Sequence, residues 1–341
     1  GDLAVICFPA AKQLKRSPPE LAKELATVLA DHGLSASAEG GYCNITLDWR
    51  SLASGLLAQI ASGDFGRGAP SGKRVLIEHT SANATGPFHM GRARNPIIGD
   101  TLARLLHYAG DEVATEYYVN DMGRQAATLA YGLSHFPSGD NEKVDHALVK
   151  CYQQASTALE NDPTAKKAIY ELMEACEQGD KKAIKDVAGA AEKMLVGMRF
   201  SLSRMGVEAE AFFNESKLVT GGMVNDVVAA LAKSPLCGDE DGAKYLDLTD
   251  HGIAGRNQKF FFTRKSGLSL YTTRDVAYHL DKFDRCDVAI NILGEDHKLQ
   301  SRLLGIALGE LGAPAPDAQF YAFVSLPGGK MSTRAGRVVY L

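Results

Sequence analysis

Hydrophobic residues recur along the chain in two spacings, and each spacing predicts a different kind of element. A short apolar run at Val75–Ile77 is typical of a buried parallel strand, and Val113–Val119 predicts the next strand. Between them lie a turn-rich segment, Ser81–Pro87, and a helical pattern over residues 91–108 that Gly110 can close. Strand, glycine-rich turn, helix and strand form a βαβ unit, whose crossover is almost always right-handed.

The same alternation returns in the last part of the chain. From Lys259 onward it predicts strands at Phe260–Phe262, Val288–Leu293 and Gln319–Val324, and helices at Tyr271–Lys282 and Leu299–Leu311. Residues from about 135 to 210 read instead as long, charged, amphipathic helices, such as Thr164–Gln178 and Lys181–Met205. We therefore expect an α/β fold with a Rossmann-like parallel sheet, whose two halves (residues 73–134 and 211–341) are separated by a helical insertion (residues 135–210).

The first residues, 1–68, predict a small α+β domain of their own. Leu3–Phe8 and Tyr42–Leu47 read as short strands. Ser17 followed by Pro18 is a helix start, and an apolar stripe runs on from there through Leu21, Leu25, Val28 and Leu29. The stretch Gly63–Gly72 is rich in Gly, Ser and Pro and marks the domain boundary.

Composition narrows the classes of protein that fit. The 341 residues are 45% hydrophobic, enough for a large core, and carry a formal net charge of -4, so a nucleic-acid partner would need a local basic patch. The six cysteines form no C-x-x-C pair, which favours reduced thiols in a cytoplasmic protein over a zinc site or disulfides. No apolar run approaches the roughly 18 residues that span a bilayer, and no signal peptide is evident, so we expect no membrane partner. The chain begins with Gly1 and not with Met.

The segment from Glu78 to Arg92 is the first that carries chemistry. Gly86, Pro87, His89 and Gly91 lie between a predicted strand and the predicted helix, where a backbone can approach phosphate and the helix N-terminus offers free N–H groups. A His at this point can donate to a phosphate oxygen as negative charge develops in a transition state. Taken alone, the pattern also fits an ordinary strand-turn-helix corner with a surface His.

The second such segment runs from Leu326 to Arg334. Gly328 and Gly329 form a hinge before Lys330, and Ser332 adds a hydroxyl. A mobile loop of this kind could bring Lys330 onto a triphosphate and neutralise the departing pyrophosphate. Taken alone, a basic hairpin loop explains the pattern equally well.

Together and in this order, the two segments resemble the paired signature motifs of class I aminoacyl-tRNA synthetases. His89-Met90-Gly91-Arg92 is similar to the HIGH motif, and Lys330-Met331-Ser332-Thr333-Arg334 is similar to the KMSKS motif. Four more segments resemble arginyl-tRNA synthetases, particularly their archaeal-type branch: Glu78–Asn83, Tyr117–Gln125, Tyr271–Tyr278 and Gly294–Lys298. The resemblance covers nearly the whole chain, including residues 1–68, which look like part of that family's N-terminal domain.

The resemblance implies a ligase that activates arginine with ATP and Mg²⁺ and passes it to arginine tRNA. It assigns catalytic roles to His89, Gly91, Arg92, Lys330, Met331 and Ser332, and it implies no metal ligands. Arginine would be bound by Glu78, Asn83, Glu215, Tyr271 and Asp275. ATP would be bound by Gly86, Pro87, His89, Gly91, Gly294, Glu295, Asp296 and Lys330.

Physical reasoning supports the pocket for the arginine side chain independently. Tyr271 and Asp275 are four residues apart, so on a helix they share one face. A carboxylate meets a guanidinium through two parallel hydrogen bonds, and a planar ring beside it suits the flat cation. Without the resemblance, a solvated helix face explains the same pair. Asn120, Asp121 and Gln125 either line the site or cap the end of a strand.

The chain departs from the family pattern in three places. Arg92 replaces the last His of the HIGH motif, and an Arg can still reach phosphate. Pro96 falls inside the predicted helix, which should therefore start later or kink there. The family's helical anticodon-binding domain does not follow Arg334 within these residues, so we expect this chain alone to charge tRNA poorly.

Two other functions stay open on the sequence alone. One is a stand-alone, synthetase-like paralogue that activates arginine for an acceptor other than tRNA. The other is a non-catalytic paralogue that only binds tRNA or a partner protein. Retention of His89, Lys330 and the pocket carboxylates argues against the second alternative. We expect the protein to be a monomer.

Overall fold

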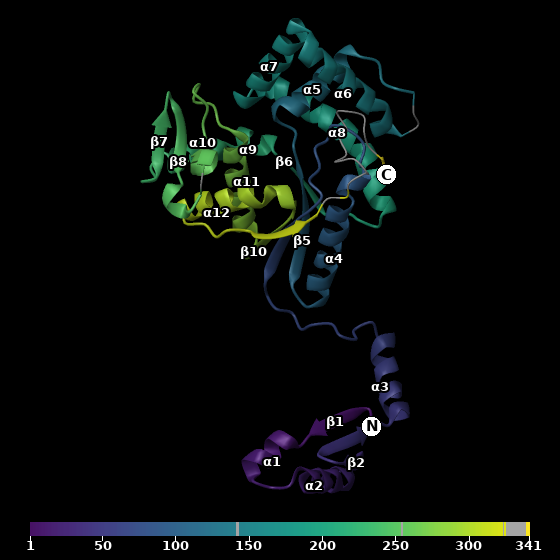
Figure 1. Ribbon diagram of the computed structural model, residues 1–341. Coiled ribbons are helices and arrows are strands. Elements are labelled where there is room, and N and C mark those ends of the chain that lie inside the picture. Colours follow the sequence, from purple (N-terminus) through teal and green to yellow (C-terminus); the bar gives the residue numbers. More distant parts are fainter. Residues whose placement is uncertain (141–142, 254, 323, 325–338) are drawn as a thin grey trace. The chain divides into compact units, whose positions relative to one another are not determined.

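The computed structural model describes residues 1–140, 143–253, 255–322, 324 and 339–341. Within these residues the chain divides into two compact units, residues 1–67 and residues 68–341 (Figure 1). No helix in the described part of the chain is long and apolar enough to cross a membrane.

The smaller unit is a three-stranded antiparallel sheet with three helices. Its strands β1 (Leu3–Ile6), β3 (Tyr42–Thr46) and β2 (Ser35–Glu39) lie in that order, and α2 (Pro18–Asp31) buries Ala22 against Cys7 and Cys43. The other helices are α1 (Phe8–Leu14) and α3 (Trp49–Ala61). The predicted first strand ends earlier than expected, because Phe8 already begins α1 and Pro9 suits its first turn.

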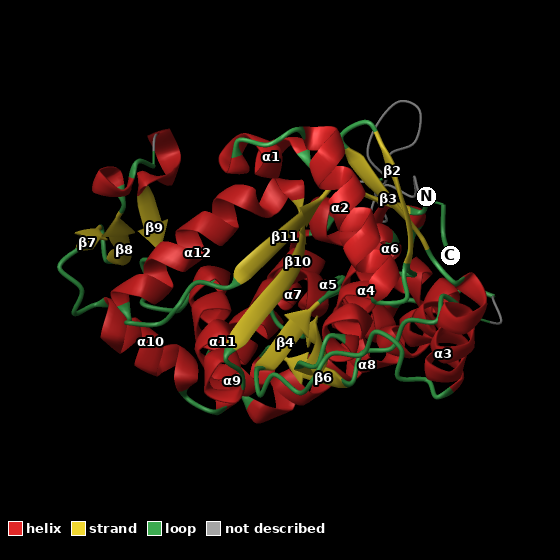
Figure 2. Ribbon diagram, turned by 90° about the horizontal axis from the view of Figure 1, so that it is seen from below, coloured by secondary structure: helices red, strands yellow, loops and turns green. Residues whose placement is uncertain are grey.

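The larger unit is built on a five-stranded parallel sheet, which confirms the predicted α/β fold. Its strands lie in the order β11 (Asp317–Tyr321), β10 (Val288–Gly294), β4 (Arg74–Glu78), β5 (Glu112–Val119) and β6 (Ala211–Asn214). Every neighbouring pair is parallel. Figure 2 shows β11, β10 and β4 side by side. All five carboxyl ends therefore lie at one edge of the sheet, which is where open α/β sheets bind ligands.

Helices cover both faces of this sheet, because alternate residues of its strands are apolar on both sides. Val75 and Ile77 of β4 pack against α4 (Arg94–Tyr108), whereas Leu76 packs against Cys286 beside the end of α11 (Tyr271–Arg285). The helix α12 (Lys298–Glu310) packs in turn on α11. The strand burial on both faces is the pattern expected of a parallel sheet between two layers of helices.

The segment between β5 and β6 forms four long helices. These are α5 (Gly123–His135), α6 (Val144–Asn161), α7 (Pro163–Glu177) and α8 (Lys181–Arg204). They gather beyond the carboxyl ends of β4 and β5 (Figure 1), and α5 already begins before the stretch predicted to be helical. Their apolar faces share one core with Ala82, Ala84 and Phe88 of the loop after β4. This packing brings the helical segment against the first signature motif.

Two features of the fold differ from the sequence prediction. The Phe260–Phe262 run was expected in the parallel sheet, but β9 (Lys259–Phe261) belongs to a separate antiparallel sheet with β7 (Cys237–Glu240) and β8 (Ala243–Asp247). This sheet stands apart from the parallel one (Figure 2), and it follows two helices, α9 (Ser216–Thr220) and α10 (Met223–Leu231). The fifth parallel strand, β6, was not predicted, because only four residues form it.

The helix after the first motif starts later than its apolar pattern suggested. Met90–Arg92 form a short 3₁₀ turn and α4 begins at Arg94, which places Pro96 in its first turn. A proline is tolerated there because the first N–H groups of a helix have no partner inside it. The expectation of a later start is confirmed.

Candidate active site

The loop after β4 holds the first motif in a constrained shape. Thr80 and Ser81 lie in the left-handed region, with φ of 71° and 32°, which is unfavourable for residues with a side chain. The Thr80 N–H donates to Asn95 Oδ1 at 2.6 Å, and Asn95 Nδ2 donates to the Ile292 carbonyl of β10 at 2.8 Å. Asn95 therefore ties this loop to the neighbouring strand, a role that the sequence analysis missed.

His89 stands at the end of this loop, directly before the 3₁₀ turn. The residue is only 8% exposed, and its Nδ1 has no hydrogen-bond partner among the described residues. A Cβ on Gly91 would lie 3.0 Å from that ring, so glycine at 91 gives the imidazole room. Burial, and then the nearby charge of Arg92, lower the pKa of His89 to about 4. His89 is therefore neutral at pH 7 and can offer a phosphate an N–H group.

This pKa predicts how acid affects stability. In the unfolded chain His89 binds a proton near pH 6.5, whereas in the folded chain it does so only near pH 4. The contribution of His89 to the free energy of unfolding is thus complete above pH 6.5. It is lost as the pH falls towards 4, and the loss is at most roughly 3 kcal/mol. The variant His89→Gln cannot protonate there, so its melting temperature should fall less than that of the parent between pH 6.5 and pH 4. Parallel melting curves for the two proteins over this range would contradict the assignment.

The second motif falls on residues that the structure does not describe. Lys330, Met331 and Ser332 lie outside the described residues, as do Thr333 and Arg334. The described residues on either side both approach the first motif. A Cβ on Gly91 would lie 3.4 Å from the Val324 carbonyl, the Met90 N–H donates to the Val339 carbonyl at 2.9 Å, and the Leu341 N–H donates to the Phe88 carbonyl at 2.9 Å.

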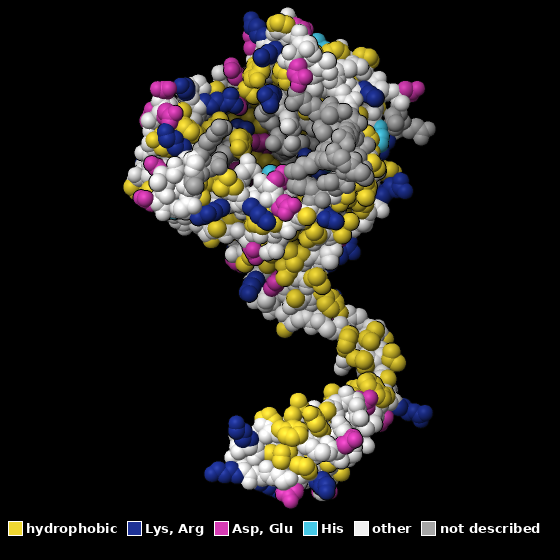
Figure 3. Space-filling model, viewed as in Figure 1, with side chains coloured by type: hydrophobic (Ala, Val, Ile, Leu, Met, Phe, Trp, Pro, Cys, Tyr) yellow, Lys and Arg dark blue, Asp and Glu magenta, His cyan; other side chains and the backbone are white. Residues whose placement is uncertain are grey.

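A hollow opens beside His89. It is lined by residues 82, 83, 85–89 and 92 and by Met198 of α8, and it therefore includes the predicted ATP-contacting Gly86 and Pro87. Figure 3 shows a hollow in one face of the larger unit, with charged side chains of both signs around it. Asn83, in the same loop, donates from Nδ2 to Gln125 Oε1 on α5 at 2.8 Å. The contact joins Asn83, which the resemblance assigns to the arginine site, to Gln125, whose role the sequence left open between lining the site and capping a strand.

Gly294, Glu295 and Asp296 lie at the same edge of the sheet. Gly294 ends β10, the strand next to β4, and Glu295–His297 form a 3₁₀ turn in front of α12. The side chains of Glu295 and Asp296 are exposed. Their position beyond a carboxyl strand end, beside the strand that leads to His89, suits contacts with a nucleotide.

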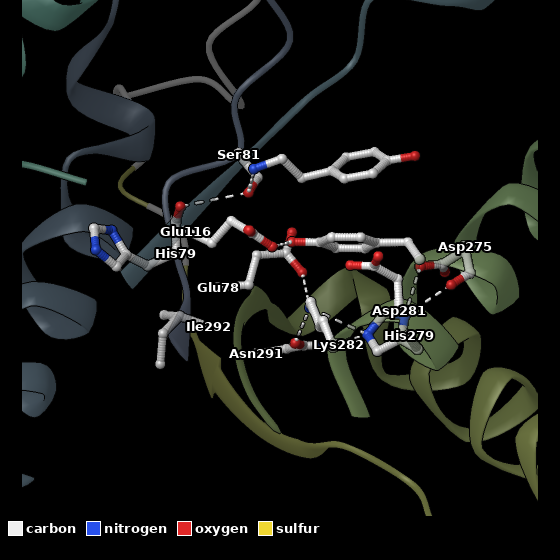
Figure 4. Close-up of polar contacts among 12 residues, drawn as sticks. Glu78, His79, Ser81, Glu116, Asp275, His279, Asp281, Lys282, Asn291 and Ile292 are labelled. Atoms are coloured by element: carbon white, nitrogen blue, oxygen red, sulfur yellow. Dashed lines mark hydrogen bonds and ion pairs between the residues drawn. The ribbon is translucent and has the colours of Figure 1, made fainter. Parts of the chain in front are cut away.

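The arginine-site candidates fall into a buried part and an exposed part. Tyr271 and Asp275 begin α11 and remain accessible, with 60% of Tyr271 and 48% of the Asp275 side chain exposed. Glu78, at the end of β4, is paired with Lys282 of α11 at 2.5 Å, as Figure 4 shows. Glu215 follows β6 and is buried. All four lie at the carboxyl ends of the parallel strands or on α11, the helix that covers this part of the sheet.

Glu215 already has a guanidinium partner within the chain, which the sequence analysis did not foresee. Arg274 donates from Nε to Glu215 Oε1, and both side chains are buried. Burial raises the pKa of Glu215, although Arg274 opposes the shift. Glu215 Oε2 and Arg274 Nη1 have no partner among the described residues. One carboxylate oxygen of Glu215 is therefore a buried acceptor without a partner among the described residues.

Asp121 is placed as a cap and not as an open site residue. Its buried carboxylate accepts hydrogen bonds from the Ser216 N–H at 2.8 Å, the Ser216 hydroxyl at 2.6 Å and Asn214 Nδ2 at 2.8 Å. These contacts fix the residues on both sides of Glu215. Of the two roles that the sequence left open for Asp121, the structure thus favours the cap.

Comparison with known proteins places the whole chain among tRNA synthetases. The family model described as tRNA synthetases class I (R), catalytic domain, matches residues 56–341, and the model described as arginyl tRNA synthetase N terminal domain matches residues 1–47. The chain is 40% identical to the arginine–tRNA ligase of Methanococcus aeolicus over 99% of its length and 42% identical to that of Methanocella arvoryzae over 98%. It spans 60% of the length of each of these curated relatives.

Solved structures share this fold. The fold matches the arginyl-tRNA synthetase of Thermus thermophilus with a TM-score of 0.70 and 25% identity, over 98% of this chain and 62% of that one. It also matches an arginyl-tRNA synthetase structure from Campylobacter jejuni with a TM-score of 0.61 and 24% identity, over 84% of this chain and 64% of that one.

Proposed function

The chain belongs to the arginyl-tRNA synthetase family of the class I aminoacyl-tRNA synthetases, and on this basis we propose that it activates arginine with ATP and transfers it to arginine tRNA. The observation that carries the proposal is the grouping of a neutral His89 and the carboxylates of Glu78, Glu215 and Asp275 around one end of a parallel sheet. The relatives with 40% and 42% identity are named arginine–tRNA ligases.

The reaction has two steps. An oxygen of the arginine carboxylate attacks the α-phosphorus of ATP, the bond from that phosphorus to the bridging oxygen breaks, and pyrophosphate leaves. A hydroxyl of the terminal tRNA ribose then attacks the carbonyl carbon of arginyl adenylate, and AMP leaves. The protein mainly positions the reactants and stabilises developing charge, and no side chain becomes covalently attached.

The roles of the side chains follow from their places in the fold. His89 would donate to the phosphate, beside the positive charge of Arg92. Gly294, Glu295 and Asp296 would contact the nucleoside of ATP. Lys330, Met331 and Ser332 are assigned to the pyrophosphate by the motif alone, because they lie outside the described residues.

Mg²⁺ would enter with ATP, bound mainly by phosphate oxygens and water. The described residues contain no group of three or more His, Cys, Asp or Glu side chains that could hold a metal ion. This arrangement suits Mg²⁺, which usually takes one or two protein carboxylates and substrate phosphates in preference to a protein cage. A cytoplasmic location and a monomeric state complete the proposal.

Arginine-dependent exchange of pyrophosphate into ATP, with arginine tRNA present, tests the activation step. Charging of that tRNA with labelled arginine tests the transfer. Exchange without charging would favour a stand-alone enzyme that uses another acceptor. Neither exchange nor charging, with tRNA still bound, would favour a non-catalytic paralogue.

The pocket should select arginine over citrulline through charge. Citrulline keeps the shape of arginine but loses the cation, so Asp275 and the unpartnered oxygen of Glu215 would face a neutral urea group. A charge-assisted hydrogen bond contributes about 1.5–3 kcal/mol, so citrulline should bind about 10–100-fold more weakly. Calorimetry with arginine, citrulline and lysine, in the presence of ATP and tRNA, measures this preference. Equal affinity for arginine and citrulline would exclude the pocket model.

A further inference from the structure

A fully buried lysine lies between two of the predicted arginine-site carboxylates. The side chain of Lys282, on α11, has 0% of its surface exposed. Its Nζ lies 2.5 Å from Glu78 Oε2, 2.8 Å from Asn291 Oδ1 and 3.4 Å from His279 Nε2. An ammonium group has three donors; Glu78 and Asn291 accept two of them, and the third has His279 Nε2 within 3.4 Å. The Tyr278 ring lies 4.2 Å from the same Nζ.

The sheet presents its two partners to Lys282 side by side. Glu78 of β4 and Asn291 of β10 are directly paired across the parallel strands, so both side chains point to the same face. That face is the one that α11 covers (Figure 4). Lys282 can therefore reach both from a single position on the helix.

The donors and acceptors allow one direction for the chain of hydrogen bonds. Lys282 can only donate, so the Asn291 atom that faces it must be the oxygen, and Asn291 Nδ2 then donates to His279 Nε2 at 2.7 Å. A nitrogen that accepts carries no proton, so the proton of the neutral ring is on Nδ1. His279 Nδ1 donates to the backbone carbonyl of Asp275 at 2.8 Å, and the carboxylate Oδ1 of Asp275 lies 3.2 Å from the same nitrogen.

We propose that Lys282 is a positioning residue for the arginine substrate, which holds Glu78 directly and holds Asp275 through Asn291 and His279. The proposal rests on the proposed function, since both carboxylates are assigned to the arginine site. The half-exposed Asp275 would otherwise be free to turn into solvent. A hydrogen-bonded network of this kind holds both carboxylates in place before arginine arrives, which lowers the entropy cost of binding.

A second ion pair on the same helix, between the partly exposed Arg285 and the buried Glu116, provides a control. Arg285 donates to both oxygens of Glu116 on β5, at 2.9 and 3.0 Å, and the Tyr278 hydroxyl donates to Glu116 at 2.8 Å. This pair also joins α11 to the sheet through a carboxylate on a strand. Among the described residues, Arg285 and Glu116 form no hydrogen bond or ion pair with Glu78 or Asp275, so loss of this pair should perturb packing without releasing either carboxylate.

Arginine affinity of the full chain, measured by calorimetry with ATP and arginine tRNA present, tests the proposal. Lys282→Met should weaken arginine binding by about 10-fold or more and should leave ATP binding within about twofold. Arg285→Met should change neither affinity by more than about twofold. Thermal unfolding of each variant shows whether it is folded at the assay temperature.

The variant His279→Gln tests the proposal even if Lys282→Met does not fold. In the parent this substitution should weaken arginine binding several-fold, but in an Asp275→Ala background it should have no further effect, because the group that His279 positions is gone. A similar loss in both backgrounds would show a general structural role and overturn the proposal. So would unchanged arginine affinity in either single variant. If the parent itself binds no arginine, the proposed function fails first.

Discussion

His89→Ala should slow the formation of arginyl adenylate by about 10²–10³-fold, while the affinity for arginine stays nearly unchanged. The reason is that His89 is neutral and buried, and its Nδ1 has no partner among the described residues. A donor held in this way interacts with phosphate most strongly when negative charge develops, so its loss raises the barrier more than it weakens binding. Single-turnover adenylate formation, with arginine and ATP saturating, measures the effect.

Two further substitutions sharpen this test. His135→Ala removes an exposed histidine at the end of α5 and should leave the rate unchanged. Arg92→His restores the residue that the HIGH motif usually has at this position, and it should leave the rate within about tenfold of the parent because either side chain can donate to phosphate. An unchanged rate for His89→Ala would remove His89 from the site.

Much of the sheet could be predicted because its signal is local. Val75–Ile77 and Val288–Leu293 are short apolar runs between turns, and each became a strand buried on both faces. Phe260–Phe262 has the same appearance but lies in an antiparallel sheet. An apolar run of this length reports that a strand is buried and does not report which strand it pairs with. Pairing depends on residues far away in the chain.

The same difference between local and distant signals decides which residues of the site could be predicted. The first motif could be located because its glycines and His89 are close together in sequence and sit at a strand end and a helix start. The partner of Glu215 could not, because Arg274 lies 59 residues away. A usable signal did exist. The apolar stripe of α11 includes Val276 and Ala277, and Arg274 falls on the same buried face. A charged residue on a buried face requires a partner.

Arg274→Met should destabilise the larger unit by about 3–5 kcal/mol at neutral pH, because it leaves the carboxylate of Glu215 buried without its cation. The loss should shrink as the pH falls. Burial already raises the pKa of Glu215 while Arg274 opposes this shift, so removal of Arg274 raises the pKa further. A carboxyl group with a raised folded-state pKa binds its proton more readily in the folded chain. Acid therefore favours the folded variant, and rising pH destabilises it.

A double substitution separates the lost ion pair from lost packing. Arg274→Met with Glu215→Met removes both charges and should recover most of the stability, since an apolar pair of similar volume avoids the cost of an unpaired buried charge. Calorimetric melting of the parent, the single variant and the double variant at pH 5 and pH 8 measures both effects. A double variant no more stable than the single one would show that Arg274 acts mainly through its packing. A single variant as stable as the parent would show that the charge of Glu215 does not depend on Arg274. The ion pair would then give no reason to expect Glu215 to be held in place for the guanidinium of the arginine substrate.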